Sequence, residues 1–233
     1  YKVAGRGELH ISILIEKMRR EGYEFQVSRP KVIFQMIDGK QHEPYENVTI
    51  TVDESLGGKV IESMAERKGQ MTNMVQDGNA IQYTFKSPTR GLLGYQSLFM
   101  KLTKGLGTIY STFEDYQPFS GEIRSRQRGV LVSKETCDTV AYALNNLQDR
   151  ADLFLGPGIS VYKGQIVGLN SREDDMIVNV AKSKKLTNMR SAGSDDNVIL
   201  TPPTLMSLEE CLSFINDDEL IEITPKTIRL RKR

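Results

Sequence analysis

The sequence is short of the residues that build metal and disulfide sites. Its 233 residues include only two cysteines, Cys137 and Cys211, and two histidines, His10 and His42. The cysteines are far apart and form no CxxC pair, which argues against a disulfide framework or a zinc ribbon and is typical of a reducing cytosol. Neither histidine belongs to an HExxH motif, so no metal ligand set is expected. We expect both thiols to lie in or near the core.

Long apolar runs and a strong net charge are also missing. No apolar run reaches the roughly 18 residues of a membrane span, and there is no signal-like start. We therefore expect a cytoplasmic chain that contacts no membrane. Separately, we expect the chain to be a monomer. The net charge is +1 and 39% of the residues are hydrophobic, which excludes a uniformly basic nucleic-acid coat and a disordered tail. Any basic surface must then be local.

Recognisable nucleotide-binding and catalytic motifs are absent too. Gly5-Arg6-Gly7 is not followed by GxxxxGK[ST], and His10 stands where the third glycine of a dinucleotide fingerprint would be. Carboxylate pairs such as Asp174-Asp175 fall in predicted turns, where they favour loop geometry, so we predict no catalytic residue. The chain is expected to bind no cofactor or metal and to be no enzyme by itself.

The first segment has the pattern of an incomplete α+β unit. Apolar residues at helical spacing predict an amphipathic helix over residues 8–21, ended by Gly22. Strands are predicted over residues 1–4, 23–27 and 31–37. Because the chain begins without a methionine, inside a predicted strand, we interpret residues 1–44 as the truncated end of an α+β domain. The whole chain is expected to be a piece of a longer protein.

A complete ferredoxin-like pattern follows over residues 45–117. Strand and helix periodicities succeed one another in the order βαββαβ, the split βαβ arrangement. The predicted strands cover residues 48–52, 70–75, 80–86 and 108–113, and the predicted helices cover residues 59–68 and 90–104. Gly69 and Gly105 mark the helix ends, and an Asp77-Gly78 turn joins the two middle strands.

Residues 118–233 change to short β-rich runs, whose spacing is typical of a small β-barrel or sandwich. Strands are predicted over residues 129–133, 140–144, 152–155, 159–162, 165–169, 176–180, 219–224 and 227–232. A single helical turn is predicted at residues 145–149, and a capping box from Ser207 to Glu210 predicts a second short helix. In the last hairpin Arg229 and Arg231 are predicted to form a basic outer face. The predicted fold class is α+β, a ferredoxin-like domain between a partial α+β domain and a barrel-like C-terminal domain.

The long connection at residues 181–197 carries its cations ahead of any acidic residue: Lys182, Lys184, Lys185 and Arg190. Structureless connections of this length are uncommon unless they are functional or disordered. We predict that this one binds RNA phosphates and is mobile in the free protein, since it has little apolar surface to offset the cost of ordering. Asn188 and Met189 could approach an unstacked base. The simpler interpretation is a solvated charge run that only confers solubility. Further candidate RNA-binding residues are Arg90, Arg126, Arg128 and Arg172.

Three stretches of the chain carry long motifs that are specific enough to suggest a family, that of the translational GTPases: GRGELHISILIEKMRREGYEFQVSR, SPTRGLLGYQSLFMKLTKGLG and LQDRADLFLGPGISVYKGQIVGLNSR. Residues 5–29, GRGELHISILIEKMRREGYEFQVSR, resemble the end of domain III of that family, and residues 46–116, with SPTRGLLGYQSLFMKLTKGLG, resemble domain V, which is shared with elongation factor G. The last third contains LQDRADLFLGPGISVYKGQIVGLNSR, KKLTNMR and IRLRKR. It resembles the C-terminal domain of the BipA (TypA) subfamily and not the end of elongation factor 4. The resemblance covers essentially the whole chain.

The resemblance implies a longer parent protein whose G domain, absent here, binds GTP and Mg and hydrolyses GTP. It implies a factor that binds the 70S ribosome and its ribosomal RNA, with roles in ribosome assembly and in adaptation to stress and cold. In that family the C-terminal domain reaches the acceptor end of A-site tRNA with a loop matched here by residues 182–190. Two alternatives stay open: the ribosome-binding part of another translational GTPase, such as elongation factor 4, and a protein-interaction module without RNA contact. An enzyme acting on RNA is a more distant third, because the chain shows no nucleophile or metal set.

Overall fold

The structure is a computed structural model that describes residues 1–123, 126–183 and 199–233. The chain divides into two compact units. Unit 1 comprises Tyr1–Glu8 and Pro30–Ser125, and unit 2 comprises Leu9–Arg29 and Arg126–Arg233. The expected mobility of residues 181–197 concerns a stretch that lies, from residue 184 on, outside the described residues.

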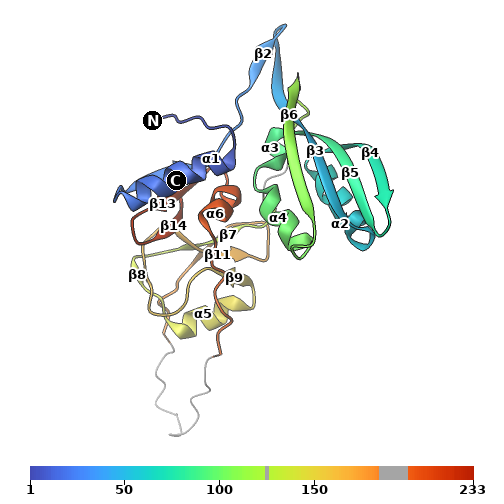
Figure 1. The fold of residues 1–233 in the computed structure, drawn as a ribbon. Helices are drawn as coiled ribbons and strands as arrows, with labels where there is room; N and C mark the ends of the chain where they lie inside the picture. Colours follow the sequence, from blue (N-terminus) through green and yellow to red (C-terminus); the bar gives the residue numbers. More distant parts are fainter. Residues whose placement is uncertain (124–125, 184–198) are drawn as a thin grey trace, which may run out of the picture. The chain divides into compact units, whose positions relative to one another are not determined.

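Unit 1 contains the predicted βαββαβ pattern. Its elements are β2 (Gln35–Ile37), β3 (Lys40–Asp53), α2 (Glu54–Glu66), β4 (Gln70–Asp77), β5 (Ala80–Pro88), α3 (Thr89–Leu92), α4 (Tyr95–Leu102) and β6 (Thr108–Pro118). β3 lies between β5 and β6, β4 pairs with β5, and the short β2 pairs with the start of β3; all these pairings are antiparallel. The strand order β6-β3-β5-β4 confirms the ferredoxin-like prediction (Figure 1).

The core of unit 1 lies between this sheet and its helices. Val48 and Ile50 alternate along β3 toward α2 and α4, where they join a cluster that includes Met64 and Phe99. The helix predicted over residues 90–104 is broken into α3 and α4, because Gly94 adopts a left-handed conformation with φ of 69°. An L-residue with a side chain rarely takes that conformation, so the glycine permits the break.

Unit 2 is built around a seven-stranded sheet. Its elements are α1 (Glu8–Arg20), β1 (Phe25–Ser28), β7 (Val130–Ser133), β8 (Cys137–Asp138), α5 (Ala141–Gln148), β9 (Ala151–Leu153), β10 (Ser160–Val161), β11 (Gln165–Asn170), β12 (Met176–Val178), α6 (Leu208–Phe214), β13 (Glu219–Ile223) and β14 (Ile228–Lys232). The sheet order is β1-β13-β14-β11-β7-β12, with β9 also paired to β11, while β8 and β10 form a separate pair. Only β12 and β7 are parallel among these described pairs.

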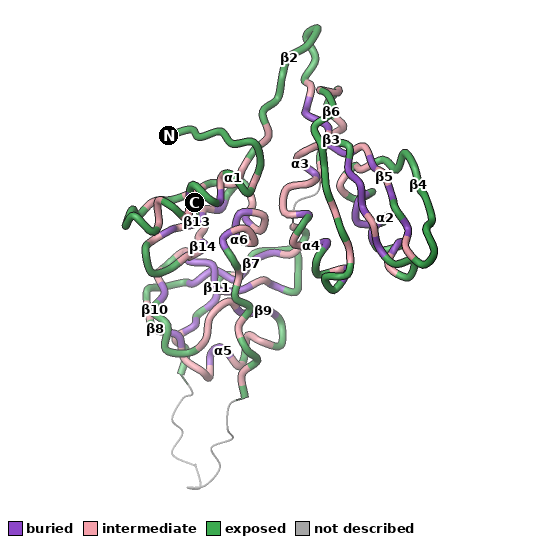
Figure 2. Tube along the Cα trace, in the orientation of Figure 1, coloured by how far each residue is buried: buried purple, intermediate pink, exposed green. Residues whose placement is uncertain are grey.

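The sheet of unit 2 is buried on both faces. On β7, Val130 and Val132 belong to one hydrophobic cluster, whereas Leu131 between them belongs to another. The first cluster includes residues of α1 and α6, and the second includes Leu144 of α5. Figure 2 shows the buried stretches along β7 and β11. Continuous burial of this kind explains why strands here read as unbroken apolar runs.

Some local predictions are wrong. Residues 140–144 were predicted as a strand, but Val140 is the N-cap of α5 and residues 141–144 form the first half of that helix. The helix forms because Leu144 and Leu147, at helical spacing, both pack on the same cluster. Residues 1–4 form no strand. The capping box at Ser207 is confirmed: Ser207 Oγ accepts a hydrogen bond from the Glu210 N–H at 3.2 Å, and the Glu210 carboxylate accepts one from the Ser207 N–H at 2.9 Å.

The boundaries of the two units differ from those of the three segments predicted from the sequence, residues 1–44, 45–117 and 118–233. β1 pairs with β13, with Phe25 opposite Ile223, so the first helix and strand belong with the C-terminal sheet. β2 pairs with β3 instead and belongs to unit 1. Pairing between segments far apart in sequence therefore decides the membership of residues 1–44. In the described part of the chain, no helix is both long and apolar enough to cross a membrane.

Candidate functional site

The predicted RNA-binding segment begins at Lys182, next to the last described residue before the gap at residues 184–198. Lys182 is exposed and follows β12. Just before it, Val180 is fully buried, and the N–H of Ala181 donates to Oδ1 of Asn179 at 2.9 Å. These contacts fix the point at which Lys182 enters solvent. The other predicted members of the segment lie outside the described residues: Lys184, Lys185, Asn188, Met189 and Arg190.

Helix α5 contacts both ends of this segment. The N–H of Val140, at the N-cap of α5, donates to the carbonyl oxygen of Val180 at 2.8 Å. At the other end of α5, Gln148 donates from Nε2 to the carbonyl oxygen of Ile199 at 3.0 Å. Its Oε1 accepts from the N–H of Thr201, also at 3.0 Å. The outgoing and returning stretches are therefore attached to opposite ends of one short helix, α5 in Figure 1.

The role of α5 was missed by the sequence analysis. A strand was expected over residues 140–144 and a single turn over residues 145–149, so Gln148 was left without a role. The signal that could have found the helix is the spacing of Leu144 and Leu147, combined with the amide-rich run from Asn145 to Gln148. No local pattern could have shown that Gln148 binds the backbone near residue 200.

Arg90 is the center of a polar cluster in unit 1. Its guanidinium binds the carboxylate of Glu43 through both Nε and Nη2, and the Nη2 contact to Oε1 is 3.2 Å long. Glu43 is fully buried, and it also accepts from the N–H of Ser120 at 2.8 Å. Burial opposes the charge of this carboxylate, but the hydrogen bonds from Arg90 and Ser120 outweigh burial and lower the pKa of Glu43. The Arg90 guanidinium also lies 4.6 Å from the ring centroid of Phe119.

Arg126 has a similar environment in unit 2. Its Nη1 and Nη2 donate to the two carboxylate oxygens of Glu219 at 3.1 and 2.7 Å, and Glu219 is fully buried. The guanidinium lies 4.3 Å from the ring centroid of Phe214. Lys232 is a second cation at the same carboxylate, with Nζ 3.1 Å from Oε1 of Glu219.

Lys232 forms ion pairs with three acidic residues of unit 2. Its Nζ lies 2.6 Å from the carboxylate of Asp175 and 2.7 Å from that of Asp218. Burial disfavours the charged amine, but the hydrogen bonds that it donates to Asp175, Asp218 and Glu219 outweigh burial and raise the pKa of Lys232. The C-terminal strand β14 is thereby attached to the loop before β12 and to the start of β13.

Arg128 comes just before β7 in the sequence, and Arg172 comes just after β11. Arg128 donates from Nε to the carbonyl oxygen of Asn170 at 2.7 Å and pairs with Asp152 at 2.9 Å. Arg172 is exposed, and its carbonyl oxygen accepts from the N–H of Gly129 at 2.8 Å. In the predicted hairpin face, Arg231 pairs with Glu222 at 3.2 Å. Of these candidates, Lys182 and Arg172 present exposed side chains, whereas Arg90 and Arg126 are largely enclosed by their own units.

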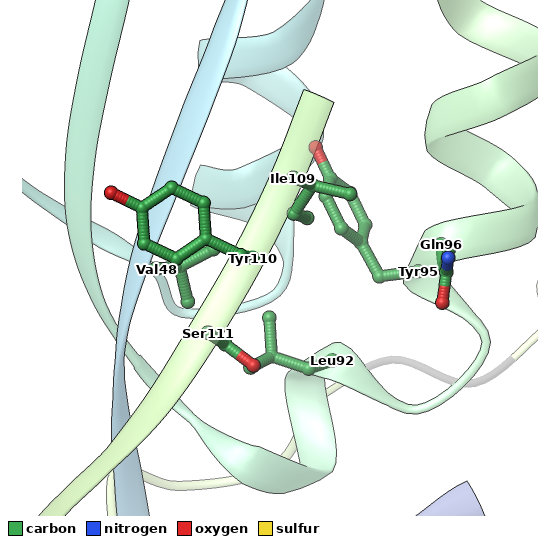
Figure 3. Close-up of a pocket in the computed structure, with 7 residues that line it drawn as sticks. All are labelled: Val48, Leu92, Tyr95, Gln96, Ile109, Tyr110 and Ser111. Carbon is green, nitrogen blue, oxygen red and sulfur yellow. The ribbon is translucent and has the colours of Figure 1, made fainter. Parts of the chain in front are cut away.

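A shallow pocket of about 230 Å³ lies in unit 1. It is lined by residues of β3, α3, α4 and β6: Val48, Leu92, Tyr95, Gln96, Ile109, Tyr110 and Ser111. Figure 3 shows Ile109 of β6 beside the Tyr95 ring, while the Tyr110 ring points to the other side of the strand, near Val48. Burial raises the pKa of Tyr95, whose hydroxyl hydrogen-bonds to Ser63 at 2.8 Å. The lining contains no lysine or arginine, so this pocket offers no cationic side chain to a phosphate.

Both cysteines lie in or beside a hydrophobic cluster, as the sequence predicted. Cys211 is buried in the cluster beneath α6, and burial raises the pKa of its thiol to about 12. Cys137 is half-buried and packs against the second cluster, and burial raises the pKa of its thiol too. A reactive cysteine needs a lowered thiol pKa. Both cysteines therefore serve as packing residues.

The fold and the family matches define the class of protein first. Residues 40–127, which make up most of unit 1, match the family described as the elongation factor G C-terminus. This match agrees with the ferredoxin-like strand order and places the chain with the translational GTPases, as the sequence resemblance predicted.

The second match identifies the family. Residues 128–233 match the TypA/BipA C-terminal domain. The whole chain is 54% identical to the large ribosomal subunit assembly factor BipA of Salmonella typhimurium and to that of Escherichia coli K12, and covers 39% of each. It is 50% identical to the protein of the same name from Haemophilus influenzae and covers 38% of it. The chain belongs to the TypA/BipA family. It spans about two fifths of the length of these curated relatives and corresponds to their C-terminal part.

Proposed function

We propose that this chain is the ribosome-binding portion of a BipA-type factor and that it contacts ribosomal RNA and the acceptor end of A-site tRNA. The observation that carries the proposal is the 54% identity, over the whole chain, to proteins described as large ribosomal subunit assembly factors. By this proposal the parent protein is a cytoplasmic, monomeric GTPase that assists ribosome assembly and adaptation to stress and cold. GTP and Mg bind the parent's G domain, and this chain supplies recognition.

Recognition depends on phosphate contacts made by the segment that starts at Lys182. Lysine and arginine side chains pair with RNA phosphates and fix position, while single-stranded ends leave bases open to further contact. Lys182 is exposed and follows the buried Val180, so its amine is available to a partner. Lys184, Lys185 and Arg190 extend the same run of cations along the chain, and Asn188 and Met189 are the proposed contacts to a base or sugar.

The other arginines are weaker candidates for contact with RNA. Arg172 is exposed and remains a proposed RNA contact, and Arg128 keeps a partly exposed guanidinium beside Asp152. Arg90 and Arg126 donate to buried carboxylates in their own units. To reach RNA, Arg90 would have to leave Glu43 without a cation, and Arg126 would have to give up two hydrogen bonds to Glu219, both of which are costly.

The test is a salt titration of ribosome binding by the intact factor in its GTP state. The variant replaces Lys182, Lys184, Lys185 and Arg190 together with Ala. Each phosphate contact contributes about −0.7 to the slope of log affinity on log salt for single-stranded RNA, so the slope should flatten by roughly two to three units. The melting temperature should hardly change, since exposed substitutions alter stability by less than about 0.5 kcal/mol each.

The matched control exchanges the same lysines for arginine and the arginine for lysine. It keeps the charge and should keep the salt slope. Equal slopes and equal affinities in the wild type and the alanine variant would contradict the proposal and reduce the segment to a solvated charge run. A lowered melting temperature in the alanine variant would show that these cations serve the fold.

A further inference from the structure

The sheet of unit 1 has two open edges, formed by β4 and β6. Among the described residues β4 pairs only with β5, and β6 pairs only with β3. Every second residue of an edge strand turns its backbone N–H and C=O groups away from the sheet, where another strand can bind them. Both strands are exposed along most of their length. The two edges therefore offer the same backbone groups to a partner, but they differ in what surrounds these groups.

Proteins protect an open edge with charged residues, proline or a bulge. In β6 these features are confined to the last part of the strand, where Glu114, Asp115 and Pro118 occur and the pairing with β3 shifts register. The preceding residues, 108–113, read TIYSTF and contain no charge, no proline and no register shift. In β4 the register shifts near the start of the strand. Of the two edges, β6 thus has the longer regular and uncharged stretch.

The pocket of unit 1 lies beside this stretch of β6. Its walls come from β6 and from the α3–α4 segment, and Ile109 lies beside the Tyr95 ring (Figure 3). Leu92 and Tyr95 belong with Ile109 to the core of unit 1, so the floor of the pocket is apolar. Ser111 is the smallest of the β6 residues in the lining, and it leaves space that a larger side chain would fill. The next residue on the same face, Phe113, is 61% exposed and extends the apolar surface along the strand.

The charges near the pocket limit what can bind there. β6 carries two carboxylates, Glu114 and Asp115, and no cation. Both carboxylates face a single amine, Nζ of Lys86, at 2.9 and 3.7 Å. One negative charge is therefore in excess within this group, and the pocket lining contains no cation. The phosphates of RNA are disfavoured at such a surface, whereas a peptide with a basic side chain opposite these carboxylates is favoured.

We propose that β6 and the α3–α4 segment form a docking site for an extended basic peptide of a partner protein. The peptide adds as an antiparallel strand to residues 108–113 and places an apolar side chain opposite Ser111, over the pocket. In recognition by strand addition, backbone hydrogen bonds give affinity and side-chain pockets give specificity. In an antiparallel pair, the position opposite Glu114 comes three residues before the position opposite Ser111. We therefore expect the peptide to carry lysine or arginine three residues before its apolar anchor.

The probe is a synthetic eight-residue peptide of threonine and valine, with leucine at position five and lysine at position two. Its binding to the 233-residue chain is measured by fluorescence anisotropy. Replacing the leucine with alanine should weaken binding by about tenfold or more, because the pocket is left unfilled. Two further peptides carry N-methyl groups on alternate backbone amides, one on the odd and one on the even positions. Only the peptide whose methylated amides face β6 should lose binding, since only those amides donate to the strand.

Two variants of the chain locate the site. Ser111→Phe fills the pocket and should weaken binding of the leucine peptide by about tenfold or more. Its matched control is Asn73→Phe on β4, which adds the same side chain at an exposed position of the other edge and should bind as the wild type does. Glu114→Lys should weaken binding by about two- to fivefold, the range of an exposed ion pair. A peptide with glutamate in place of its lysine should recover that loss in Glu114→Lys but should bind the wild type more weakly.

Several results would overturn the docking site. Normal binding by Ser111→Phe at an unchanged melting temperature would place the peptide elsewhere, and weakened binding by Asn73→Phe would place it on β4. Should Ser111→Phe fail to fold, the charge exchange at Glu114 decides, and equal affinities for both peptides in Glu114→Lys would contradict the site. Equal binding by the two N-methylated peptides would exclude strand addition.

Two other occupants are tested in the same assay. Dimers of the chain that Ser111→Phe abolishes would make a second copy the occupant. A uridine oligonucleotide that displaces the peptide would make the surface an RNA site. Either result overturns the proposal. None of these measurements uses Lys182 or the residues after it, so the proposed function stands or fails separately.

Discussion

Each unit contains an arginine–glutamate ion pair with a buried glutamate, but the other groups that contact the glutamate differ between the two units. In each pair, two nitrogen atoms of an arginine donate hydrogen bonds to the carboxylate of a fully buried glutamate, Arg90 to Glu43 and Arg126 to Glu219. Each guanidinium also lies over a phenylalanine ring, Phe119 for Arg90 and Phe214 for Arg126. In unit 1 the other described hydrogen bonds to the carboxylate come from the N–H and hydroxyl of Ser120, which are neutral donors. In unit 2 the carboxylate has a second cation, Lys232. The unit 1 pair therefore depends on one arginine, whereas the charge in unit 2 is shared.

The comparison shows what the sequence context of a cation leaves out, namely the buried partner that the folded chain gives it. Arg90 and Arg126 are both basic residues near turns and were reasonable RNA-binding candidates. In the folded chain each one neutralises a carboxylate that is almost inaccessible to water. An ion pair of this kind adds little net stability against an apolar replacement, but breaking it by removing one partner is expensive. The substitutions that follow use that asymmetry.

The largest effect is expected from Arg90→Met in unit 1. It leaves Glu43 buried without a cation, which should destabilise unit 1 by about 3–5 kcal/mol. The measurement is native-state amide hydrogen exchange, read at Ile50 for unit 1 and at Ile221 for unit 2, because it resolves the two units separately. Unit 2 should be unchanged. A loss below about 1 kcal/mol at Ile50 would show that Ser120 alone suffices to hold the carboxylate.

A smaller effect is expected from Arg126→Met in unit 2. Lys232 still faces Glu219 at 3.1 Å, and the N–H of Asn216 still donates to it at 3.0 Å. The loss should be about 1–3 kcal/mol, the range for removing hydrogen bonds to a buried group. Adding Lys232→Met should cost more than the sum of the two single changes, since only then is Glu219 left without a cation. Strict additivity in this cycle would contradict the idea that the two cations share the charge.

The smallest and most specific effect concerns pH. The pKa of Glu43 is lowered in the folded state, so its contribution to stability is fully present above the unfolded pKa, about 4.3, and is lost as pH falls through the folded value. The pKa of Lys232 is raised, so its contribution is fully present below the unfolded pKa, about 10.4, and is lost as pH rises through the folded value.

Two single variants test these opposite signs. Glu43→Gln should flatten the acid loss of stability in unit 1, and Lys232→Met should flatten the alkaline loss in unit 2. Urea titrations at a series of pH values, followed by circular dichroism and supplemented by hydrogen exchange, provide the measurement. An unchanged acid profile in Glu43→Gln would mean that other carboxylates control that part of the curve.

Much of the fold was determined by local sequence patterns. The βαββαβ order, the capping box at Ser207 and the final hairpin were all predicted correctly, because each depends on contacts between residues close in sequence or on a simple alternation of apolar side chains. The family was also visible in the sequence, since its motifs are long and specific. The cationic run from Lys182 is likewise a property of the sequence alone, and its RNA-binding role stays a proposal.

Only the tertiary structure decided how distant segments are combined. Pairing of β1 with β13 assigns the first helix and strand to the C-terminal sheet, and no pattern in residues 1–44 encodes a partner about 200 residues away. The carboxylate partners of Arg90 and Arg126 lie 47 and 93 residues away in the sequence, so burial of a charge could not be foreseen from its neighbours. The same holds for Gln148, whose amide acquires a role only when the backbone at Ile199 and Thr201 reaches the end of α5. Local propensity selects helices and strands, but long-range burial and pairing choose which of them meet.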